Sequence, residues 1–333
     1  MRALISKAKG GPDTLVVGEL PDPVAGPGEV VVAVKACGVN FPDVLIIQDM
    51  YQRKPPRPFA PGAEIAGVVV SVGPDVTVRK VGERVSAFST SGGMAERILL
   101  RAADAMPLPD WVSFEDAAAS ALTYGTSYHA LKDRGQLKAG ETLLVLGAGG
   151  GVGIAAVEIG KAMGARVIAA VSSQDKLDVA LSHGADHGFI YPREIDSPEA
   201  SKKLADAFKA ACAPQGTADV IYDPVGGPYS EPALRAAAWN GRFLVVGFPA
   251  GVAKIPLNLP LLKNCAIVGV AFGAFAIRDP AAAMVNHAAL MDLFRSGALK
   301  PHISARFPLE RGAEAIQALA DRKALGKIIV TIG

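Results

Sequence analysis

The feature that most constrains the fold is a hydrophobic segment that runs directly into a cluster of glycines. It reads Leu143-Leu-Val-Leu-Gly-Ala-Gly-Gly-Gly-Val-Gly-Ile154. The apolar run predicts a buried strand, and the apolar spacing that follows predicts a helix over 153–164. Glycine permits a sharp turn between them and lets backbone amides approach a bound group, while the helix N-terminus favours an anion. The segment therefore predicts a dinucleotide-binding turn, and the alternative is a tight strand–helix junction without a ligand.

The spacing in this turn is close to the usual dinucleotide fingerprint, with alanine in place of its first glycine. The residues expected to lie against a pyrophosphate are Ala148, Gly150, Gly151, Val152 and Gly153.

The end of the next predicted strand, 166–171, indicates which dinucleotide is bound. An NAD-binding chain usually carries an acidic residue there for the ribose 2′-hydroxyl. This chain has Ser172 and Ser173 instead, followed by Lys176 in the next helix. Small hydroxyls leave room for a 2′-phosphate, and a lysine can neutralise it. The sequence therefore predicts NADPH, and the alternative for Lys176 is an exposed helix lysine.

The pattern of the chain changes near residue 123. Before it, apolar segments such as 29–37 and 64–72 alternate with Pro and Gly clusters, which predicts short strands in an antiparallel or barrel-like unit. After it, predicted strands alternate with predicted helices, which is typical of a doubly wound parallel sheet. The predicted strands of this second part are 141–147, 166–171, 219–223, 242–247 and 266–271. A helix over 281–296 and a last strand over 327–332 complete the prediction.

Composition excludes several classes of protein. The 333 residues suit two domains, and 34 Lys and Arg balance 32 Asp and Glu. This near-neutral charge, without a basic stripe, argues against a nucleic-acid partner. Three scattered cysteines indicate a reduced intracellular chain. No apolar stretch approaches the ~20 residues that span a bilayer, and none suits a signal peptide, so we expect a cytoplasmic protein without a membrane partner.

Short motifs in a fixed order make the chain similar to the zinc-free branch of the medium-chain dehydrogenase/reductase superfamily, the NADPH:quinone oxidoreductase (zeta-crystallin-like) family. The motifs are Gly38-Val-Asn-Phe-Pro-Asp43, Pro61-Gly-Ala-Glu-Ile-Ala-Gly67, Val81-Gly-Glu-Arg-Val85, Ala148-Gly-Gly-Gly-Val-Gly153 and Tyr222-Asp-Pro-Val-Gly-Gly227.

The resemblance implies an α/β chain with two kinds of domain. Residues 1–122 would form the first part of a catalytic domain with a GroES-like, partly closed β-barrel. Residues 123–267 would form a Rossmann domain, a doubly wound parallel sheet that binds NADPH. Residues 268–333 would supply an edge strand and return to the catalytic domain. The active site would lie in the cleft between the domains, and a homodimer would form by pairing of edge strands near 268–275.

The resemblance also argues against a metal. Zinc-binding relatives carry a cysteine where this chain has Asn40, and a histidine where it has Ala63. Catalytic zinc needs about three protein ligands, mostly thiolate or imidazole. We therefore expect no metal site.

The resemblance implies a catalytic group without a metal. Asn40, Asp43 and Tyr51 would lie around the nicotinamide, and Tyr51 is the candidate proton donor. The alternatives are turn formation for Asn40 and helix capping for Asp43. Further cofactor contacts implied in the same way are Thr126, Tyr191, Gly247 and Phe248. The alternative for Tyr191 is packing at the surface.

The leading functional prediction is hydride transfer from NADPH to a quinone or an α,β-unsaturated carbonyl. A dedicated enoyl-thioester reductase is the alternative, with Arg53, Lys54 and Arg57 as a basic surface for the carrier phosphates. A third possibility is a non-catalytic role, structural or RNA-binding, as in zeta-crystallin relatives.

Overall fold

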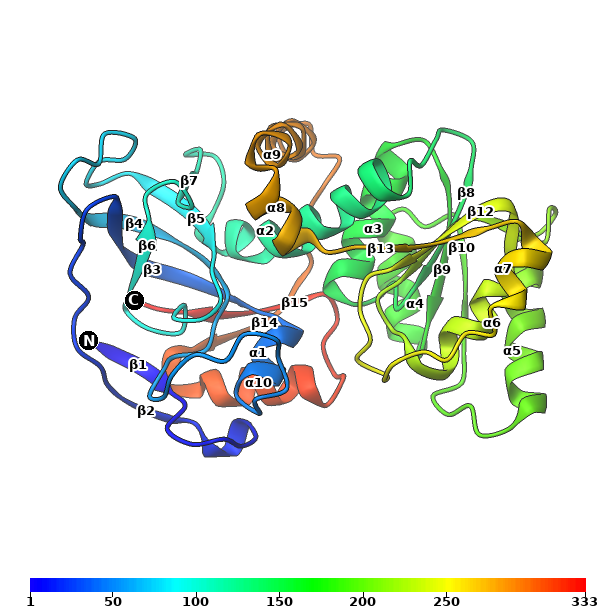
Figure 1. The fold of residues 1–333 in the computed structure, drawn as a ribbon, viewed down its shortest axis with the longest axis horizontal. Helices are drawn as coiled ribbons and strands as arrows, with labels where there is room; N and C mark the ends of the chain where they lie inside the picture. The colour runs from blue at the N-terminus through cyan, green and yellow to red at the C-terminus, as the bar shows by residue number, and fades with distance from the viewer. The chain divides into compact units, whose positions relative to one another are not determined.

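The structure is a computed structural model that describes all residues from Met1 to Gly333. It divides into two compact units (Figure 1). The first unit contains Met1–Leu122 and Pro301–Gly333, and the second contains Thr123–Lys300. The last predicted segment, 268–333, is therefore split after Lys300, and its first part belongs to the second unit.

The first unit is built on a seven-stranded, mainly antiparallel sheet with the strand order β14-β15-β3-β4-β5-β7, in which β6 also pairs with β3. A separate ribbon is formed by β1 and β2. The strands are β1 Arg2–Ile5, β2 Val16–Glu19, β3 Glu29–Val39, β4 Glu64–Val72, β5 Arg84–Phe88, β6 Arg97–Arg101, β7 Met106–Pro107, β14 Ile303–Pro308 and β15 Lys327–Thr331. The helices are α1 Phe41–Ile46, α10 Gly312–Ala320 and the one-turn η1 Pro12–Thr14 and η4 Leu309–Arg311. Helix α2, Phe114–Tyr128, continues from this unit into the second.

Alternation along the strands explains the core of the first unit. Val30, Val32 and Val34 of β3 are buried in one apolar cluster together with Val69 of β4 and Val85 of β5. Side chains on every second residue share one face of a strand, so this pattern packs one face of the sheet against the core. The predicted strands 29–37 and 64–72 correspond to β3 and β4.

The second unit is a six-stranded sheet with the order β10-β9-β8-β11-β12-β13 and parallel pairing throughout. The strands are β8 Thr142–Leu146, β9 Arg166–Val171, β10 His187–Ile190, β11 Ala218–Asp223, β12 Ala237–Val245 and β13 Ala266–Gly269. The helices are α3 Gly151–Ala162, α4 Gln174–Ser182, α5 Pro198–Ala211, α6 Ser230–Leu234, α7 Asn258–Lys263, α8 Phe272–Arg278, α9 Pro280–Arg295, the π-helix η2 His129–Arg134 and the one-turn η3 Gly227–Tyr229.

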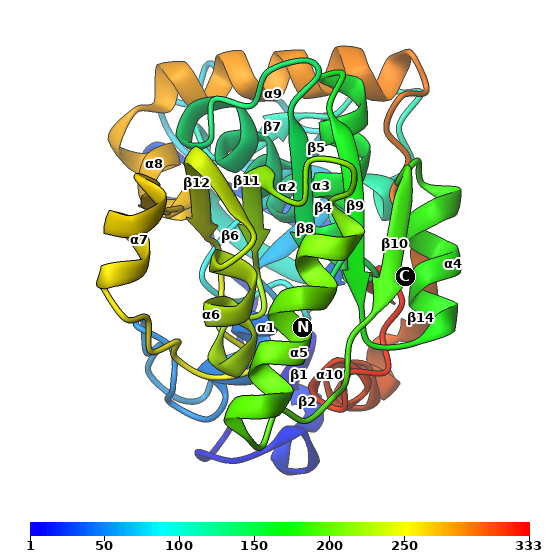
Figure 2. The same cartoon turned by 90° about the vertical axis from the view of Figure 1, so that its right-hand side faces the viewer.

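Both faces of the parallel sheet are covered by helices (Figure 2). Leu143 and Val145 of β8 pack in one cluster with α3, and Leu144 and Leu146 pack in another with α5. Burial on both faces explains why β8 is a continuous apolar run rather than an alternating one. The strand order reverses between β8 and β11, so the carboxyl ends of these two strands flank the switch point of the sheet, where ligands of such folds bind. The α/β fold class predicted from the sequence is confirmed.

One predicted element is wrong. Strand β13 ends at Gly269, and residues 272–275 of the expected edge strand 268–275 lie in helix α8. The reason is visible in the packing of two phenylalanines three residues apart. The ring of Phe272 lies against Gly125, and Phe275 stacks on His129 with ring centroids 4.0 Å apart. Both contacts need one helical face, which a strand would split between two faces.

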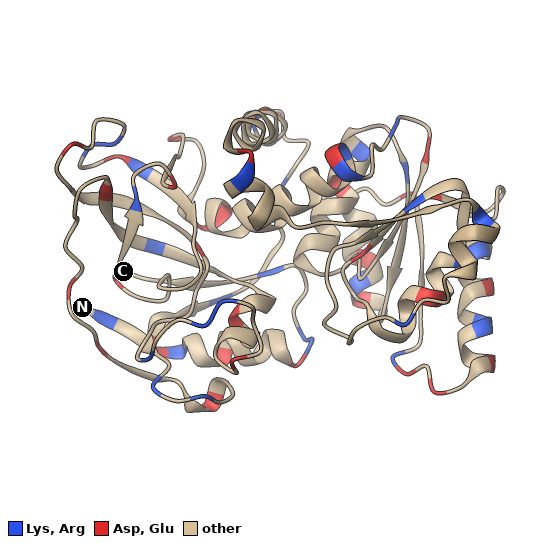
Figure 3. Cartoon of the chain, in the orientation of Figure 1, with Lys and Arg blue, Asp and Glu red and all other residues tan.

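Charged side chains of both signs are interspersed over each unit (Figure 3). No helix combines the length and the apolar character that crossing a membrane requires.

Candidate functional site

The Gly-rich turn of the second unit is shaped by close contacts, some of which leave no room for a side chain. Gly147 follows β8 with φ of +59°, and Gly150 is the N-cap of α3. A Cβ atom on Gly153 would lie 2.2 Å from the backbone oxygen of Gly147. Glycine at 153 therefore allows α3 to start directly against the end of β8. No side chain caps this helix, and its first turn has no acidic residue, which suits an anionic ligand.

The residues predicted to bind a 2′-phosphate lie beside this turn. A Cβ atom on Gly149 would lie 2.6 Å from the Cβ of Lys176, so the lysine stem passes directly against the turn. The ammonium group of Lys176 lies 3.5 Å from the hydroxyl of Ser172. Ser173 is the N-cap of α4. The structure thus brings Ser172, Ser173 and Lys176 together with the Gly-rich turn.

The other side of the switch point is formed by the loops after β11 and β12. A Cβ atom on Gly147 would lie 2.9 Å from the side chain of Val225, so the loop after β11 touches the Gly-rich turn. Gly247 follows β12, and its amide lies 3.3 Å from the backbone oxygen of Asp223. Phe248, the next residue, is 56% exposed.

Two further predicted cofactor residues have different surroundings. Thr126 is half-buried on α2, and its neighbour Ser127 donates to the backbone oxygen of Val152 at 2.9 Å. The hydroxyls of Ser127 and Tyr222 are 2.8 Å apart. Sequence reasoning missed these two residues, and a polar group inside an apolar strand is the signal that could have found Tyr222. Tyr191 is buried against Tyr229, with ring centroids 5.1 Å apart, so it packs in the interior and not at the surface.

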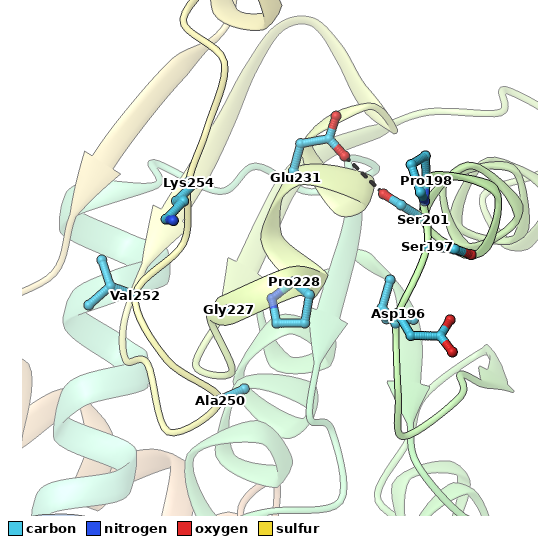
Figure 4. Close-up of a pocket in the computed structure, with 11 residues that line it drawn as sticks. Asp196, Ser197, Pro198, Ser201, Gly227, Pro228, Glu231, Ala250, Val252 and Lys254 are labelled. Carbon is cyan, nitrogen blue, oxygen red and sulfur yellow. Dashed lines mark hydrogen bonds between the residues drawn. The ribbon is translucent and has the colours of Figure 1, made fainter.

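A groove of about 540 Å³ opens beside the same loops (Figure 4). Its walls include Asp196, Ser197 and Ser201 from the start of α5, Glu231 from α6, and Val252 and Lys254 from the loop after β12. Glu231 accepts a hydrogen bond of 3.2 Å from Ser201, which joins α6 to α5 beside the groove. Acidic and basic groups are both present, so the groove has no single sign of charge.

The first unit contains a buried polar network around Asn40. Lys327 donates to Glu64 at 2.8 Å, to the Asn40 side-chain oxygen at 2.7 Å and to the backbone oxygen of Val39 at 3.1 Å. The Asn40 amide nitrogen in turn donates to Glu64 at 2.9 Å. The second carboxylate oxygen of Glu64 accepts the amide of Leu122 at 2.7 Å. A buried carboxylate and a buried ammonium are tolerated here because each is paired and fully hydrogen-bonded.

Asp43 lies next to this network and is fully buried. Its carboxylate accepts the amide of Asn40 at 2.8 Å and the amide of Gly62 at 3.0 Å. Burial raises the pKa of Asp43 to about 6, although these two hydrogen bonds oppose the shift. The contact with Asn40 is the helix capping that the sequence offered as its alternative, at the start of α1. A direct catalytic role for Asn40 and Asp43 stays a prediction.

Tyr51 is half-buried and packs against the apolar core of the first unit. Of the three basic residues near it, Arg57 is held by Asp49 at 2.9 Å and by the backbone oxygen of Ile47 at 2.9 Å. Arg53 and Lys54 are exposed. A proton-donating role for Tyr51 also stays a prediction.

The structure has no group of three or more His, Cys, Asp or Glu side chains arranged to hold a metal ion. Cys37 is buried, and burial raises the pKa of its thiol well above the ordinary value, with further contributions from Asp43 and Glu64.

Comparison with known proteins agrees with both units. The family model "Alcohol dehydrogenase GroES-like domain" matches residues 26–110, and "Zinc-binding dehydrogenase" matches residues 151–288. A quinone oxidoreductase-like protein 2 homolog of Nematostella vectensis is 39% identical over 309 residues, which cover 92% of this chain and 82% of the relative. The chain belongs to the quinone oxidoreductase-like medium-chain dehydrogenases/reductases.

Solved structures of this family have the same fold. A probable oxidoreductase of Mycobacterium abscessus has a TM-score of 0.88 at 39% identity, over 99% of this chain and 98% of the other. The Escherichia coli quinone oxidoreductase complexed with NADPH has a TM-score of 0.87 at 29% identity, over 99% and 100%. The resemblance inferred from the motifs is thereby confirmed.

Proposed function

We propose that the chain transfers a hydride from NADPH to a quinone or an α,β-unsaturated carbonyl without using a metal. The observation that carries the proposal is the convergence of Ser172, Ser173 and Lys176 on the Gly-rich turn at the switch point of the parallel sheet. Backbone amides at the start of α3 would hold the pyrophosphate, and Lys176 would hold the 2′-phosphate.

The fit of a dinucleotide to these residues rests on backbone space. Gly153 and Gly147 lie too close for any side chain between them, which draws the first turn of α3 against the end of β8. The remaining proposed contacts are Ala148, Gly150, Gly151, Val152, Thr126, Tyr191, Gly247 and Phe248. The cofactor supplies the hydride when bound, and the protein supplies orientation and a proton or hydrogen bond. NADPH is bound by structural relatives of this chain, including the quinone oxidoreductase of Escherichia coli.

Metal-free chemistry is proposed from the side chains at the positions of the zinc ligands. Asn40 offers an amide whose oxygen accepts from Lys327 and whose nitrogen donates to Glu64. An amide that is hydrogen-bonded in this way is a poor replacement for a thiolate ligand, and the methyl group of Ala63 cannot replace an imidazole. Carbonyl polarisation would therefore come from hydrogen bonds, with Tyr51 as the proposed proton donor.

The choice of acceptor is open between a quinone and an enone, with an enoyl thioester as the alternative. A carrier-bound substrate needs cations for its phosphates. Arg57 is already held by Asp49 and Ile47, which leaves Arg53 and Lys54 as exposed cations near Tyr51. Because Arg57 is already paired, fewer cations near Tyr51 are available for carrier phosphates, which favours a small electrophile over an enoyl thioester.

The test is a direct assay of NADPH oxidation. The purified protein is incubated with NADPH and, in turn, a benzoquinone, a short enone and an enoyl-CoA, and the absorbance of NADPH is followed. We expect a decrease with the quinone or the enone, and the same rate after treatment with a metal chelator. Oxidation of NADPH by none of the three acceptors would contradict the proposed function. One zinc ion per chain by elemental analysis, lost together with activity in chelator, would contradict its metal-free part.

A further inference from the structure

Asp223, the last residue of β11, is buried at the switch point of the parallel sheet, where it is 2% exposed. One carboxylate oxygen accepts the amides of Val225 at 2.8 Å and Gly226 at 2.9 Å. The other accepts the hydroxyl of Ser230 at 2.5 Å. The side chain therefore folds the loop that follows β11 back onto the end of its own strand.

The backbone oxygen of the same residue holds a second loop. It accepts the amide of Val246 at 2.9 Å and that of Gly247 at 3.3 Å, at the end of β12. Asp223 therefore accepts hydrogen bonds from residues of two loops that are separate in sequence, 224–230 and 246–251.

The two loops also interlock with each other. The amide of Ala250 donates to Val225 at 2.9 Å, and the amide of Gly227 donates to Gly251 at 2.7 Å. Gly227 has φ of +59°, and a Cβ atom on it would lie 2.3 Å from the backbone oxygen of Ala250. This approach is too close for a side chain. Because the two loops are in direct contact and hydrogen-bonded to each other, a displacement of the first loop would also displace the second.

These loops form one side of the proposed cofactor site. Val225 packs against Gly147 of the Gly-rich turn, and the second loop carries Gly247 and Phe248. Gly227 and Ala250, one from each loop, line the groove (Figure 4). Any displacement of the Asp223 carboxylate would be passed to all of these surfaces.

We propose that Asp223 is a positioning residue for NADPH: its carboxylate holds the loop 224–230, and through it the loop 246–251, in the arrangement that receives the cofactor. This inference rests on the proposed NADPH-dependent function. Burial raises the pKa of Asp223, and the hydrogen bonds from Ser230, Gly226 and Val225 oppose that shift. The same three donors would lose their acceptor if the carboxylate were removed, and two of them, Gly226 and Ser230, are buried.

Two substitutions separate positioning from a general structural role. Asp223→Ala removes the acceptor of all three donors. Asp223→Asn keeps one oxygen for the two amides, and its amide nitrogen can donate to the Ser230 hydroxyl. We expect Asp223→Ala to weaken NADPH binding at least about tenfold with kcat at saturating NADPH within about threefold, and Asp223→Asn to stay within about threefold of the parent in both.

The control is Leu204→Ala, which opens a cavity in the apolar cluster that Val225 and Ala250 also pack against, but removes no hydrogen bond of either loop. It should lower the melting temperature but leave NADPH affinity unchanged. Hydrogen exchange without cofactor gives an independent readout, because Asp223→Ala should speed exchange of the amides of 225–227 in the first loop and of Ala250 in the second, whereas Leu204→Ala should not.

The outcomes separate a failure of the positioning role of Asp223 from a failure of the proposed NADPH-dependent function. Unchanged exchange in both loops, or unchanged NADPH affinity, in Asp223→Ala overturns the inference. An equal loss of affinity in Leu204→Ala overturns it as well. Absence of NADPH binding by the parent protein instead removes the proposed function, and the exchange experiment then still decides whether Asp223 holds the loops.

Discussion

At the scale of single residues, Tyr51 distinguishes the two classes of acceptor. Hydride addition to an enone leaves charge on the carbonyl oxygen, which a positioned phenol can protonate, whereas a reduced quinone spreads its charge and can take a proton from water later. General acid help contributes typically ~10²–10⁴-fold. Tyr51→Phe should lower kcat with the best enone by at least ~30-fold, or roughly 2 kcal/mol, and with quinones by only a few-fold.

The measurement is steady-state kinetics with both acceptors, with NADPH affinity followed by fluorescence as the control. The side chain of Tyr51 packs against the core of the first unit through its ring, which phenylalanine keeps. Enone reduction at the parent rate in Tyr51→Phe would make Tyr51 a packing residue, and the proton would then come from water or another group.

A second residue-scale prediction concerns Lys176, whose stem passes against the Gly-rich turn. A charge-assisted contact with a phosphate is worth roughly 1.5–3 kcal/mol, or about tenfold to a hundredfold in affinity. The parent should prefer NADPH over NADH by this factor, and Lys176→Glu should abolish or reverse the preference. The measurement is the dissociation constant of each cofactor for both proteins. Asp178→Lys, on the same helix, serves as the control for a change of surface charge, and equal constants for the two cofactors in the parent would refute the assignment.

A third prediction at this scale follows from the pKa of Asp43. Burial, the largest cause, raises it from 3.8 to about 6 in the folded chain. Between about pH 4 and 6 the folded state therefore binds more protons than the unfolded state, so the contribution of Asp43 to the free energy of unfolding falls as pH rises through this window. A shift of about two pKa units corresponds to roughly 3 kcal/mol.

This prediction can be measured in the first unit alone, because one tryptophan lies in each unit, Trp111 in the first and Trp239 in the second. In a Trp239→Phe background, urea unfolding followed by Trp111 fluorescence should show the parent losing stability relative to Asp43→Asn between pH 4.5 and 7. The contrary outcome is that the free energy of unfolding of the parent, relative to Asp43→Asn, stays constant or rises with pH. It would mean that the two amide hydrogen bonds outweigh burial and that the carboxylate is the favoured form.

At the scale of elements, the start of α3 depends on one glycine. A Cβ atom on Gly153 would meet the backbone of Gly147 at 2.2 Å and the Cα of Ala148 at 2.8 Å, and neither can move without shifting the turn. Gly153→Ala should weaken NADPH binding at least about thirtyfold and lower the stability of the second unit by about 1–3 kcal/mol. Gly150→Ala is the matched control for stability, because its Cβ atom would meet only the Gly147 oxygen, at an ordinary 3.5 Å.

Calorimetry and fluorescence titration measure the two effects. We expect Gly150→Ala to melt close to the parent temperature. Parent-like melting and parent-like NADPH affinity in Gly153→Ala would show that the turn can relax, and that close packing of α3 against β8 is not required for the cofactor.

Elements with a strong period were predictable from the sequence, and contacts distant in sequence were not. The strand 166–171 matches β9 because residues 167–171 are apolar throughout and are flanked by the polar residues Arg166 and Ser172. The expected strand 268–275 failed because Phe272 and Phe275 pack on one helical face against residues about 150 positions earlier, which no local pattern reports. The Glu64–Lys327 pair was missed for the same reason. Both residues are charged in otherwise apolar strands, and that is the signal that could have found them.

The residues of the candidate site also divide into those that local sequence predicts and those whose contacts are distant in sequence. Gly150 and Gly153 allowed the turn to be predicted, because the conformation and close packing that glycine permits are a local property of the chain. Asp223 lies in the motif 222–227, but its contacts could not be predicted, since they depend on two loops that meet only when β11 and β12 are paired side by side.

At the scale of the whole molecule, an apolar surface at the edge of the parallel sheet predicts a homodimer. Strand β13 is the edge strand, so one side of it lacks a partner strand. Helix α7 next to it in sequence exposes Leu261 and Leu262 by 78% and 68%, and Leu257 just before the helix is 81% exposed. Contiguous apolar groups beside an open strand edge are typical of an interface with a second chain.

We expect the parent to sediment with the mass of two chains at micromolar concentration and Leu261→Glu to sediment as a single chain, because a carboxylate buried without a partner costs several kcal/mol. Val24→Glu, at an equally exposed position of the first unit, should leave the mass of two chains unchanged. A single-chain mass for the parent, or the mass of two chains for Leu261→Glu, would mean that this surface does not form the dimer.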